Sequence, residues 1–408
     1  MKLSKVSQLL LVSSIGLLVA TLMTACQLVT IDYVYVANSA GSSTGPNGQI
    51  EAFATDSQSG ALRLGHAAVS SGGVNPVAMA VSGDYANLYV ANHDDDTVVH
   101  FTIDANGVLT QKDTVTLSDS PVSLAVDSAG TYLYVLSGTT TATLTEFSLS
   151  SGTIGSAAAT EPLTIPGYAS DAVIPTGVNV LVNNSVVHGA AVYATAYDQS
   201  AYNPGGPVTS TAHPGWVFGF SIGSGGALTP ASGSPFQAGV KPSALASDPT
   251  DRYVYVTDFA SNQLIGYGIQ SGSTLAYLLN GPFKTGNEPQ SVAIDPRGKF
   301  MYVANALDSS VSAYVIDLST GTPSSAVNAT GSATNSTDTE PMSVAVDPAL
   351  GRFVYTANFL GNSVSGFRLD PIAGTLAPTQ ATPYPTGSKP TALVIIPHGN
   401  HSLQAVTP

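Results

Sequence analysis

One six-residue pattern, written seven times, constrains this chain more than any other feature of its sequence. Most copies alternate aromatic and β-branched residues and end in a turn-forming residue, which predicts a β-strand. A strand that recurs every roughly 45 to 60 residues predicts one closed repeat structure rather than a string of separate domains. The copies read YVYVAN (33–38), NLYVAN (87–92), YLYVLS (132–137), AVYATA (191–196), YVYVTD (253–258), FMYVAN (300–305) and FVYTAN (353–358).

A second pattern accompanies the first and usually opens with proline. Its small and branched side chains suit an innermost strand crowded around a central axis, and proline suits the first residue of a strand. A third strand and a weaker fourth follow each copy of the first pattern, so we predict an all-β, seven-bladed β-propeller with four-stranded blades. The predicted inner strands are PVAMAVS (76–82), PVSLAVD (121–127), TGVNVLV (176–182), PSALASD (242–248), PQSVAID (289–295), PMSVAVD (341–347) and PTALVII (390–396).

The two ends of the repeat region complement each other. The repeats begin with a second strand and finish with an inner strand, so both belong to one blade. Pairing them closes the ring and hides two strand edges that would otherwise invite aggregation. We therefore expect the propeller to cover residues 31–397, followed by a tail at 398–408.

The N-terminal segment is typical of an export signal. Lys2 and Lys5 precede an apolar run at 9–21, and the only cysteine of the chain, Cys26, ends the segment. This arrangement resembles the lipobox of bacterial lipoproteins, so we expect a signal peptide at 1–25 and a lipidated Cys26 with a short tether at 26–30. The protein would then be exported and anchored on the periplasmic side or in the outer membrane. An ordinary cleaved signal, or a short anchor helix with an incidental cysteine, is the alternative.

The charge balance excludes one class of partner. Charged residues make up only 9% of the chain and the net charge is −14. Removal of the signal leaves 10 basic against 26 acidic residues, a net charge of −16. Such a surface opposes nucleic acids and anionic lipid head groups, and it repels phosphorylated substrates. We expect a monomer that touches the membrane only through its N-terminal lipid.

Recurrent polar residues are interpreted as structural. Four aspartates end inner strands, where a carboxylate can cap the turn that follows. Five polar residues end the second strands, and recurrence in five blades favours a turn role, with contact to a ligand as a second use. The aspartates are Asp127, Asp248, Asp295 and Asp347, and the strand-end residues are Asn38, Asn92, Asp258, Asn305 and Asn358.

Two stretches, YVYVTDFASNQLIGYGI and DPRGKFMYVANALDSSVSAYVID, resemble the seven-bladed lactonase family, which includes 6-phosphogluconolactonase and muconate-lactonizing propellers, and the YVTN-repeat propellers of exported proteins. The resemblance implies a His, Arg and Glu cluster at one mouth of the channel, with the Glu after the strand-end Asn. No glutamate stands there in this chain, so no catalytic residue carries over. The residues that follow the strand-end Asn are Ser39, His93, Ala306 and Phe359, and those that lead into the inner strands include Lys241, Glu288, Glu340 and Lys389.

A long loop at 196–216 is the first candidate for ligand binding. Loops that enter the inner strands and loops that join second to third strands share one face of a propeller, which we call the top face. Flat aromatic rings beside polar groups suit stacking on a sugar or another small ring. A loop that packs on its own aromatics explains the same residues equally well. The candidates are Tyr197, Asp198, Tyr202, His213 and Trp216.

The turn NHDDDT at 92–97 is a weaker candidate. Asp94, Asp95 and Asp96 form an oxygen-rich turn that suits Ca²⁺, although a solvated acidic turn is favoured because no glycine or glutamate follows at EF-hand spacing. No cofactor is required. Four histidines without a partner at ligand spacing are interpreted as incidental: His100, His188, His398 and His401.

These features lead to two functional hypotheses. The first is a lipid-anchored propeller that binds a small molecule, glycan or protein on its top face. The second is a lactone hydrolase, a carboxylic-ester hydrolase whose active site the sequence does not assign. Candidate ligand contacts beyond the long loop are Lys241, Asp258, Asn305 and Asn358.

Overall fold

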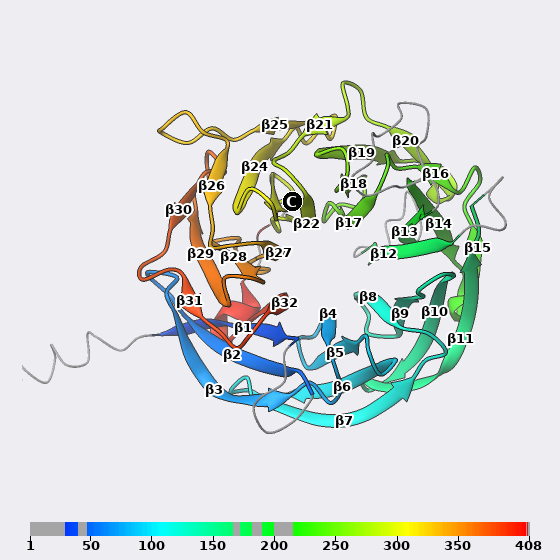
Figure 1. The fold of residues 1–408 in the computed structure, drawn as a ribbon, viewed down its shortest axis with the longest axis horizontal. Helices are drawn as coiled ribbons and strands as arrows, with labels where there is room; N and C mark the ends of the chain where they lie inside the picture. Colours follow the sequence, from blue (N-terminus) through cyan, green and yellow to red (C-terminus); the bar gives the residue numbers. More distant parts are fainter. Residues whose placement is uncertain are drawn as a thin grey trace, which may run out of the picture.

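The computed structural model describes residues 29–39, 47–165, 172–181, 190–199, 215–404 and 406. These residues form seven antiparallel sheets arranged in a ring, which confirms the seven-bladed propeller (Figure 1). Blade 1 combines both ends of the propeller, because its order is β3-β2-β1-β32. The red strand β32 lies beside the blue strand β1 in Figure 1, with Tyr35 opposite Val394. The predicted closure of the ring is confirmed.

Each blade runs from an inner strand at the channel to an outer strand at the rim. The inner strands are β4 (Pro76–Val81), β8 (Pro121–Val126), β12 (Val173–Val180), β17 (Pro242–Ser247), β22 (Pro289–Ile294), β27 (Pro341–Val346) and β32 (Pro390–Pro397). The second strands are β1 (Thr30–Asn38), β5 (Asn87–Asn92), β9 (Tyr132–Ser137), β13 (Ala191–Asp198), β18 (Tyr253–Asp258), β23 (Phe300–Asn305) and β28 (Phe353–Asn358).

The third strands are β2 (Gln49–Asp56), β6 (Thr97–Ile103), β10 (Ala142–Ser150), β14 (Gly215–Ile222), β19 (Gln263–Ile269), β24 (Ser310–Ile316) and β29 (Ser363–Leu369). The outer strands are β3 (Leu62–Ser70), β7 (Leu109–Thr116), β11 (Thr153–Leu163), β15 (Leu228–Pro230), β20 (Leu275–Tyr277), β25 (Pro323–Ser325) and β30 (Leu376–Pro378). In blades 4 to 7 the outer position holds a second short piece, namely β16 (Phe236–Gln237), β21 (Phe283–Lys284), β26 (Thr334–Ser336) and β31 (Tyr384–Pro385). Three short 3-10 helices are η1 (Ser224–Gly226), η2 (Ser271–Ser273) and η3 (Gly399–Leu403).

The second strands hold the ring together because both of their faces are buried. On β1, Tyr35 packs toward Leu88 and Val90 of blade 2, whereas Val34 and Val36 pack toward blade 7. The period-two alternation of the repeated pattern therefore supplies each neighbouring blade with an apolar face. A single blade has no such partner and cannot bury these side chains alone.

The tyrosine at the third position of the pattern adds a specific bond between blades. Tyr255 donates its hydroxyl hydrogen to the Gly321 carbonyl oxygen of blade 6 at 2.6 Å, in the turn between the third and outer strands. Five other blades repeat this bond, and all six acceptor residues have positive φ. The remaining donor and acceptor pairs are Tyr35 and Gly107, Tyr89 and Gly152, Tyr193 and Ser273, Tyr302 and Gly374, and Tyr355 and Gly60.

The aromatic residue two positions earlier packs on the same turn. A Cβ atom on Gly321 would lie 2.4 Å from the Tyr253 ring, and one on Gly374 would lie 2.3 Å from the Phe300 ring. Glycine is needed there because φ is positive and the ring lies against its Cα atom. The sequence aromatic-Val-Tyr-Val is thus one docking unit for the next blade.

Blade 3 departs from this arrangement. Glu146 of β10 is completely buried, and one of its carboxylate oxygens lies only 2.0 Å from the position that a Cβ atom on Gly226 would take. Among the described residues, neither the Glu146 carboxylate nor the Tyr134 hydroxyl has a hydrogen-bond partner of normal geometry. Burial raises the pKa of Glu146 to about 7.

The predicted turn role of the four inner-strand aspartates is confirmed. Asp248 accepts hydrogen bonds from the backbone N–H groups of Arg252 and Tyr253, both at 2.7 Å, and Asp295 does the same for Lys299 and Phe300. Asp127 and Asp347 cap the equivalent turns.

We predict that Tyr255→Phe lowers the free energy of unfolding by about 1–3 kcal/mol, because the buried Gly321 carbonyl oxygen loses its donor. Tyr132→Phe is the control, since it removes the same hydroxyl group from a half-buried tyrosine that bonds no glycine carbonyl among the described residues. Urea denaturation followed by circular dichroism measures both. Equal losses in the two variants would show that the bond between blades contributes nothing beyond packing.

The raised pKa of Glu146 predicts that the stability of the folded state depends on pH. Its folded pKa of about 7 lies above the ordinary 4.5, so the folded state binds more protons between these values and loses stability as pH rises from 4.5 to 7. We expect Glu146→Gln to exceed the wild type in stability at pH 8 and this gain to shrink toward pH 4.5. Glu161→Gln, in the neighbouring strand β11, is the control. A gain that is independent of pH would contradict the interpretation.

Candidate functional site

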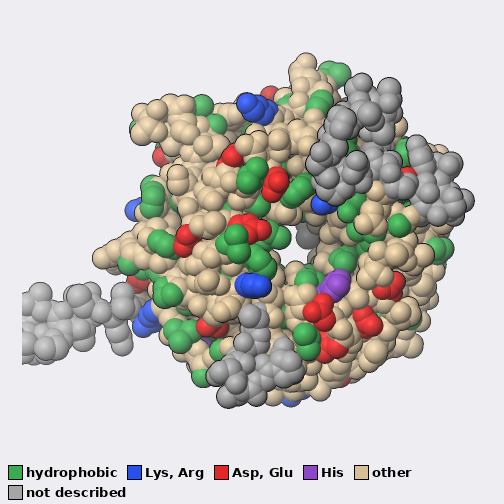
Figure 2. Space-filling model, in the orientation of Figure 1, with side chains coloured by type: hydrophobic (Ala, Val, Ile, Leu, Met, Phe, Trp, Pro, Cys, Tyr) green, Lys and Arg blue, Asp and Glu red, His purple; other side chains and the backbone are tan. Residues whose placement is uncertain are grey.

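The inner strands enclose a channel of about 240 Å³ along the axis of the ring. Its wall is built mainly from the second and third residues of the inner strands, where small residues such as Ser123 and Ser291 alternate with larger ones such as Gln290 and Met342. Figure 2 shows the central opening, with basic, acidic and histidine side chains around it.

Most hydroxyl groups in the channel wall are engaged in bonds between blades. Ser123 accepts from the backbone N–H of Val178, whereas Thr391 donates to the Pro76 carbonyl oxygen at 2.6 Å. Ser291 and Ser343 likewise accept backbone N–H groups of the following blade. These serines and threonines are therefore part of the ring architecture and not candidates for a nucleophile.

The residues that lead into the inner strands form the top mouth of the channel. We define the top mouth by Lys241, Glu288, Glu340 and Lys389, which stand directly before the inner-strand prolines of blades 5, 6, 7 and 1. Their carbonyl oxygens accept the backbone N–H of the residue that follows the second strand, for example Ala306 to Glu288 at 2.9 Å. Four consecutive blades thus carry a basic, two acidic and a basic residue at equivalent positions on the top face.

The backbone conformation at the top mouth makes these residue types unusual. Glu288, Glu340 and Lys389 have φ between +54° and +59°, and Asn75 of blade 2 has φ +56°. Asparagine and glycine adopt this conformation most readily, whereas other residues are held there at a cost of about 1–3 kcal/mol. Charged residues at three such positions indicate a role for the side chains themselves.

Of the two lysines of the top mouth, Lys241 is more enclosed than Lys389. Its ammonium nitrogen lies 4.3 Å from the centre of the Phe259 ring and 5.6 Å from that of Tyr197. Asp258 accepts the backbone N–H of Lys241 at 2.9 Å and so fixes where the side chain begins. Burial lowers the pKa of Lys241, and the carboxylate of Glu288 partly offsets this effect. A half-buried ammonium group on aromatic rings suits contact with a developing or permanent negative charge.

The opposite side of the mouth carries the acidic turn of blade 2. His93 Nδ1 lies 2.8 Å from Asp94 Oδ1, which also accepts from the Asn75 side chain. Asp95 accepts the backbone N–H of Val74, and Asp96 accepts the hydroxyl of Ser120. The three carboxylates have different partners in different loops, and calcium binding at this turn stays a prediction.

The structure brings together some of the predicted ligand contacts and separates others. Tyr197, Lys241 and Asp258 meet between blades 4 and 5, and Asp198 is the next residue of β13. Asn305 and Asn358 are completely buried and bond serines of the adjacent third strand, so their turn role is confirmed.

Other candidates lie elsewhere. Trp216 belongs to β14 and packs against the core between blades 3 and 4. Cys26, Tyr202, His188 and His213 lie outside the described residues.

The interpretation of His100 and His401 as incidental was wrong. His100 is buried and its two ring nitrogens lie 2.6 Å from Asp113 Oδ1 and 2.9 Å from Asn87 Oδ1. Burial raises the pKa of Asp32 to about 8. Burial alone would lower the pKa of His401, but the hydrogen bond with Asp347 outweighs this effect, and the pKa is raised to about 9. No local pattern indicates these pairs, because the partners lie 13, 54 and 369 residues apart in the chain.

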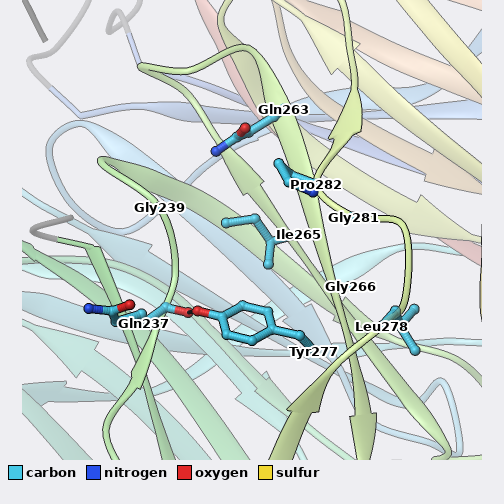
Figure 3. Close-up of a pocket in the computed structure, with 9 residues that line it drawn as sticks. All are labelled: Gln237, Gly239, Gln263, Ile265, Gly266, Tyr277, Leu278, Gly281 and Pro282. Atoms are coloured by element: carbon cyan, nitrogen blue, oxygen red, sulfur yellow. Dashed lines mark hydrogen bonds between the residues drawn. The ribbon is translucent and has the colours of Figure 1, made fainter. Parts of the chain in front are cut away.

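A pocket on blade 5 is larger than the channel but is an architectural feature. It has about 310 Å³ and is lined by Ile265, Gly266 and Leu278 between the two outer pieces β20 and β21 (Figure 3). Figure 3 also shows Tyr277 pointing toward Gln237, whose carbonyl oxygen accepts its hydroxyl hydrogen at 2.8 Å. An equivalent pocket of about 370 Å³ lies on blade 7 around Ser365. Both pockets form because the outer position of the blade is divided between two short strands.

Comparisons with known proteins agree with the fold. A family model described as "Lactonase, 7-bladed beta-propeller" matches residues 23–116, 47–169 and 226–335, together more than half of the chain. A comparison with curated proteins gave no match. Within the residues that the structure describes, no helix has the length and hydropathy of a membrane span.

Several solved structures share the architecture. The periplasmic gluconolactonase of Pseudomonas aeruginosa is 19% identical, with a TM-score of 0.69, over 90% of this chain and 99% of that one. A putative 6-phosphogluconolactonase of Bacteroides fragilis is 17% identical, with a TM-score of 0.70, over 90% and 98%. Hydrazine synthase of Kuenenia stuttgartiensis is 18% identical, with a TM-score of 0.54, over 79% and 92%. Because these titles name different chemistries, the shared fold alone does not assign one.

Proposed function

Because this chain belongs to the family of seven-bladed β-propeller lactonases, we propose that it binds a small polar ring compound, such as a sugar lactone or its open acid, at the top mouth. The observation that carries the proposal is the set of four charged residues, Lys241, Glu288, Glu340 and Lys389, before the inner strands of four consecutive blades. Lysines offer donors to the carboxylate or carbonyl oxygens of such a ligand, and glutamates accept from its hydroxyl groups. The rings of Tyr197 and Phe259 beside Lys241 supply apolar contact.

The net charge of the protein restricts the chemical class of ligand that the top mouth can bind. The net charge of −16 after removal of the signal repels phosphorylated sugars, so an unphosphorylated compound is favoured. A glycan end or a protein loop that carries the same groups would use the same contacts, and both remain alternatives to a free small molecule.

Hydrolysis of a lactone is the second candidate function, and the charge interaction between Lys241 and Glu288 favours it. A water molecule would attack the lactone carbonyl carbon while Glu288 or Glu340 accepts its proton. Lys241, whose pKa is lowered by burial, would hold the oxyanion. The ring C–O bond then breaks, the ring oxygen takes up the proton, and an open hydroxy acid leaves.

Export and lipid attachment at Cys26 are part of the proposal. The basic start, the apolar run and the position of Cys26 support it. Strand β1 begins at the face opposite the top mouth, so an anchor at Cys26 would leave the top mouth pointing away from the bilayer. Palmitate labelling of expressing bacteria should mark the wild type and not Cys26→Ser. Equal labelling of both would overturn the anchor.

Calorimetric titration with D-gluconate and a pH-stat assay with D-glucono-δ-lactone test the two candidate functions. We expect Lys241→Met to weaken gluconate binding at least about tenfold, the effect of losing one charge-assisted hydrogen bond. Of Glu288→Gln and Glu340→Gln, the variant that removes the base should abolish any turnover while leaving binding measurable. Lys112→Met, an exposed lysine of β7, is the control and should change neither.

Binding without turnover would support a binding protein. Turnover that Glu288→Gln and Glu340→Gln both leave unchanged would contradict the proposed base. Absence of both binding and turnover in the wild type would contradict a sugar-lactone ligand at the top mouth.

A further inference from the structure

A buried cluster lies at the bottom of the ring, the face opposite the top mouth. Asp32 stands near the start of β1, Asp347 follows β27, and His401 belongs to η3 after β32. Within the described part of the chain, this is the only group of three ligand-type side chains whose ligand atoms lie within 4.8 Å of one another. It joins the first strand, the seventh blade and the C-terminal turn at the closure of the ring.

The distances within the cluster match those between the ligands of one metal ion. His401 Nε2 lies 3.1 Å from Asp347 Oδ1 and 3.3 Å from Asp32 Oδ1. Ligand bonds of about 2.0–2.2 Å at tetrahedral or octahedral angles place neighbouring ligand atoms roughly 3 to 3.6 Å apart. The three ligand atoms all lie within 4.8 Å of one another, so only small side-chain movements are needed to enclose an ion.

The orientation of His401 calls for a cation between the three groups. Its Nδ1 donates to Gln404 Oε1 at 2.8 Å, so in the neutral ring the lone pair of Nε2 faces the two carboxylates. A second hydrogen bond of this kind is what orients histidine ligands in metal sites. The lone pair and the carboxylates repel one another unless a proton or a metal ion lies between them.

Asp32 is the member of the cluster whose carboxylate lacks hydrogen-bond donors in the part of the chain that the structure describes. It is completely buried, and among the described residues neither of its oxygens has a hydrogen-bond partner of normal geometry. Buried carboxylates are normally hydrogen-bonded, paired or bound to metal. Asp347, by contrast, accepts the backbone N–H groups of Ala349 and Arg352, which favour its ionised form.

We propose that Asp32, Asp347 and His401 form a binding site for a divalent transition-metal ion of the zinc class, which clamps the closure of the propeller. One imidazole and two carboxylates suit Zn²⁺, while Ca²⁺ and Mg²⁺ prefer oxygen ligands alone. A surface pocket of about 330 Å³ is lined by His398, Gly399 and Ser402, the neighbours of His401 in sequence. None of the three proposed ligands lines this pocket, which lies beside the cluster.

The test uses the full chain, freed of metal with a chelator and titrated with Zn²⁺. We expect one Zn²⁺ per chain by calorimetry and a rise in melting temperature that Ca²⁺ does not produce. Asp32→Asn and His401→Gln should each weaken Zn²⁺ binding by at least about tenfold. His398→Gln, in the same turn, and His93→Gln, at the acidic turn of blade 2, should leave it unchanged.

Asp32→Asn removes a buried charge with little change of shape, so it should fold even where His401→Gln does not. Binding of Co²⁺ to the wild type, followed by its visible absorption, provides a readout that needs no variant. Zn²⁺ binding that survives Asp32→Asn, or a wild type without a thermal shift and without a Co²⁺ spectrum, would show that the cluster holds a proton only. Neither result depends on whether the top mouth binds a lactone.

Discussion

The rest of the structure depends on one interaction, the hydrogen bond from the tyrosine of one blade to a carbonyl oxygen in a left-handed turn of the next. It fixes how far each blade approaches its neighbour, and in four of the six cases an aromatic residue two positions earlier packs on the same turn. Six blades make it, so the ring accumulates six nearly identical contacts, and their number rather than their individual strength sets the geometry of the ring. Blade 3 is the exception, because the buried carboxylate of Glu146 lies beside Gly226, where the tyrosine bond would otherwise form.

This constraint explains why function is confined to a few positions. The second strands are buried on both faces, and the hydroxyl groups of the inner strands bond the neighbouring blades. The residues just before the inner strands are fixed in their backbone but not in their side chains. Variation from Asn75 to Glu288 and Lys389 at equivalent positions therefore leaves the ring intact while changing the chemistry of the opening.

The fold could be predicted from the sequence because each of its determinants is local and repeated. Strand type, blade number and ring closure follow from patterns of six or seven residues, and so does the turn role of Asp248 and Asn305. Lys241 is among the ligand contacts predicted from the sequence, but the long loop after Tyr197 is the first candidate there, because a loop rich in aromatics stands out more than single charged residues before prolines.

The buried clusters could not be predicted because they occur once and join distant segments. Asp32 and His401 lie 369 residues apart and meet only when the ring closes. Glu146 reads as a surface residue of an alternating strand, yet it is completely buried because the neighbouring blade covers that face. Such residues are visible only when the packing of blade on blade is known.

The most direct test of the central claim, that the top mouth is the ligand site, is a crystal structure of the chain with D-gluconate. We predict that the gluconate carboxylate lies beside the ammonium group of Lys241, with sugar hydroxyl groups donating to Glu288 or Glu340. Gluconate bound instead in the blade 5 pocket between β20 and β21, with the top mouth empty, would contradict it.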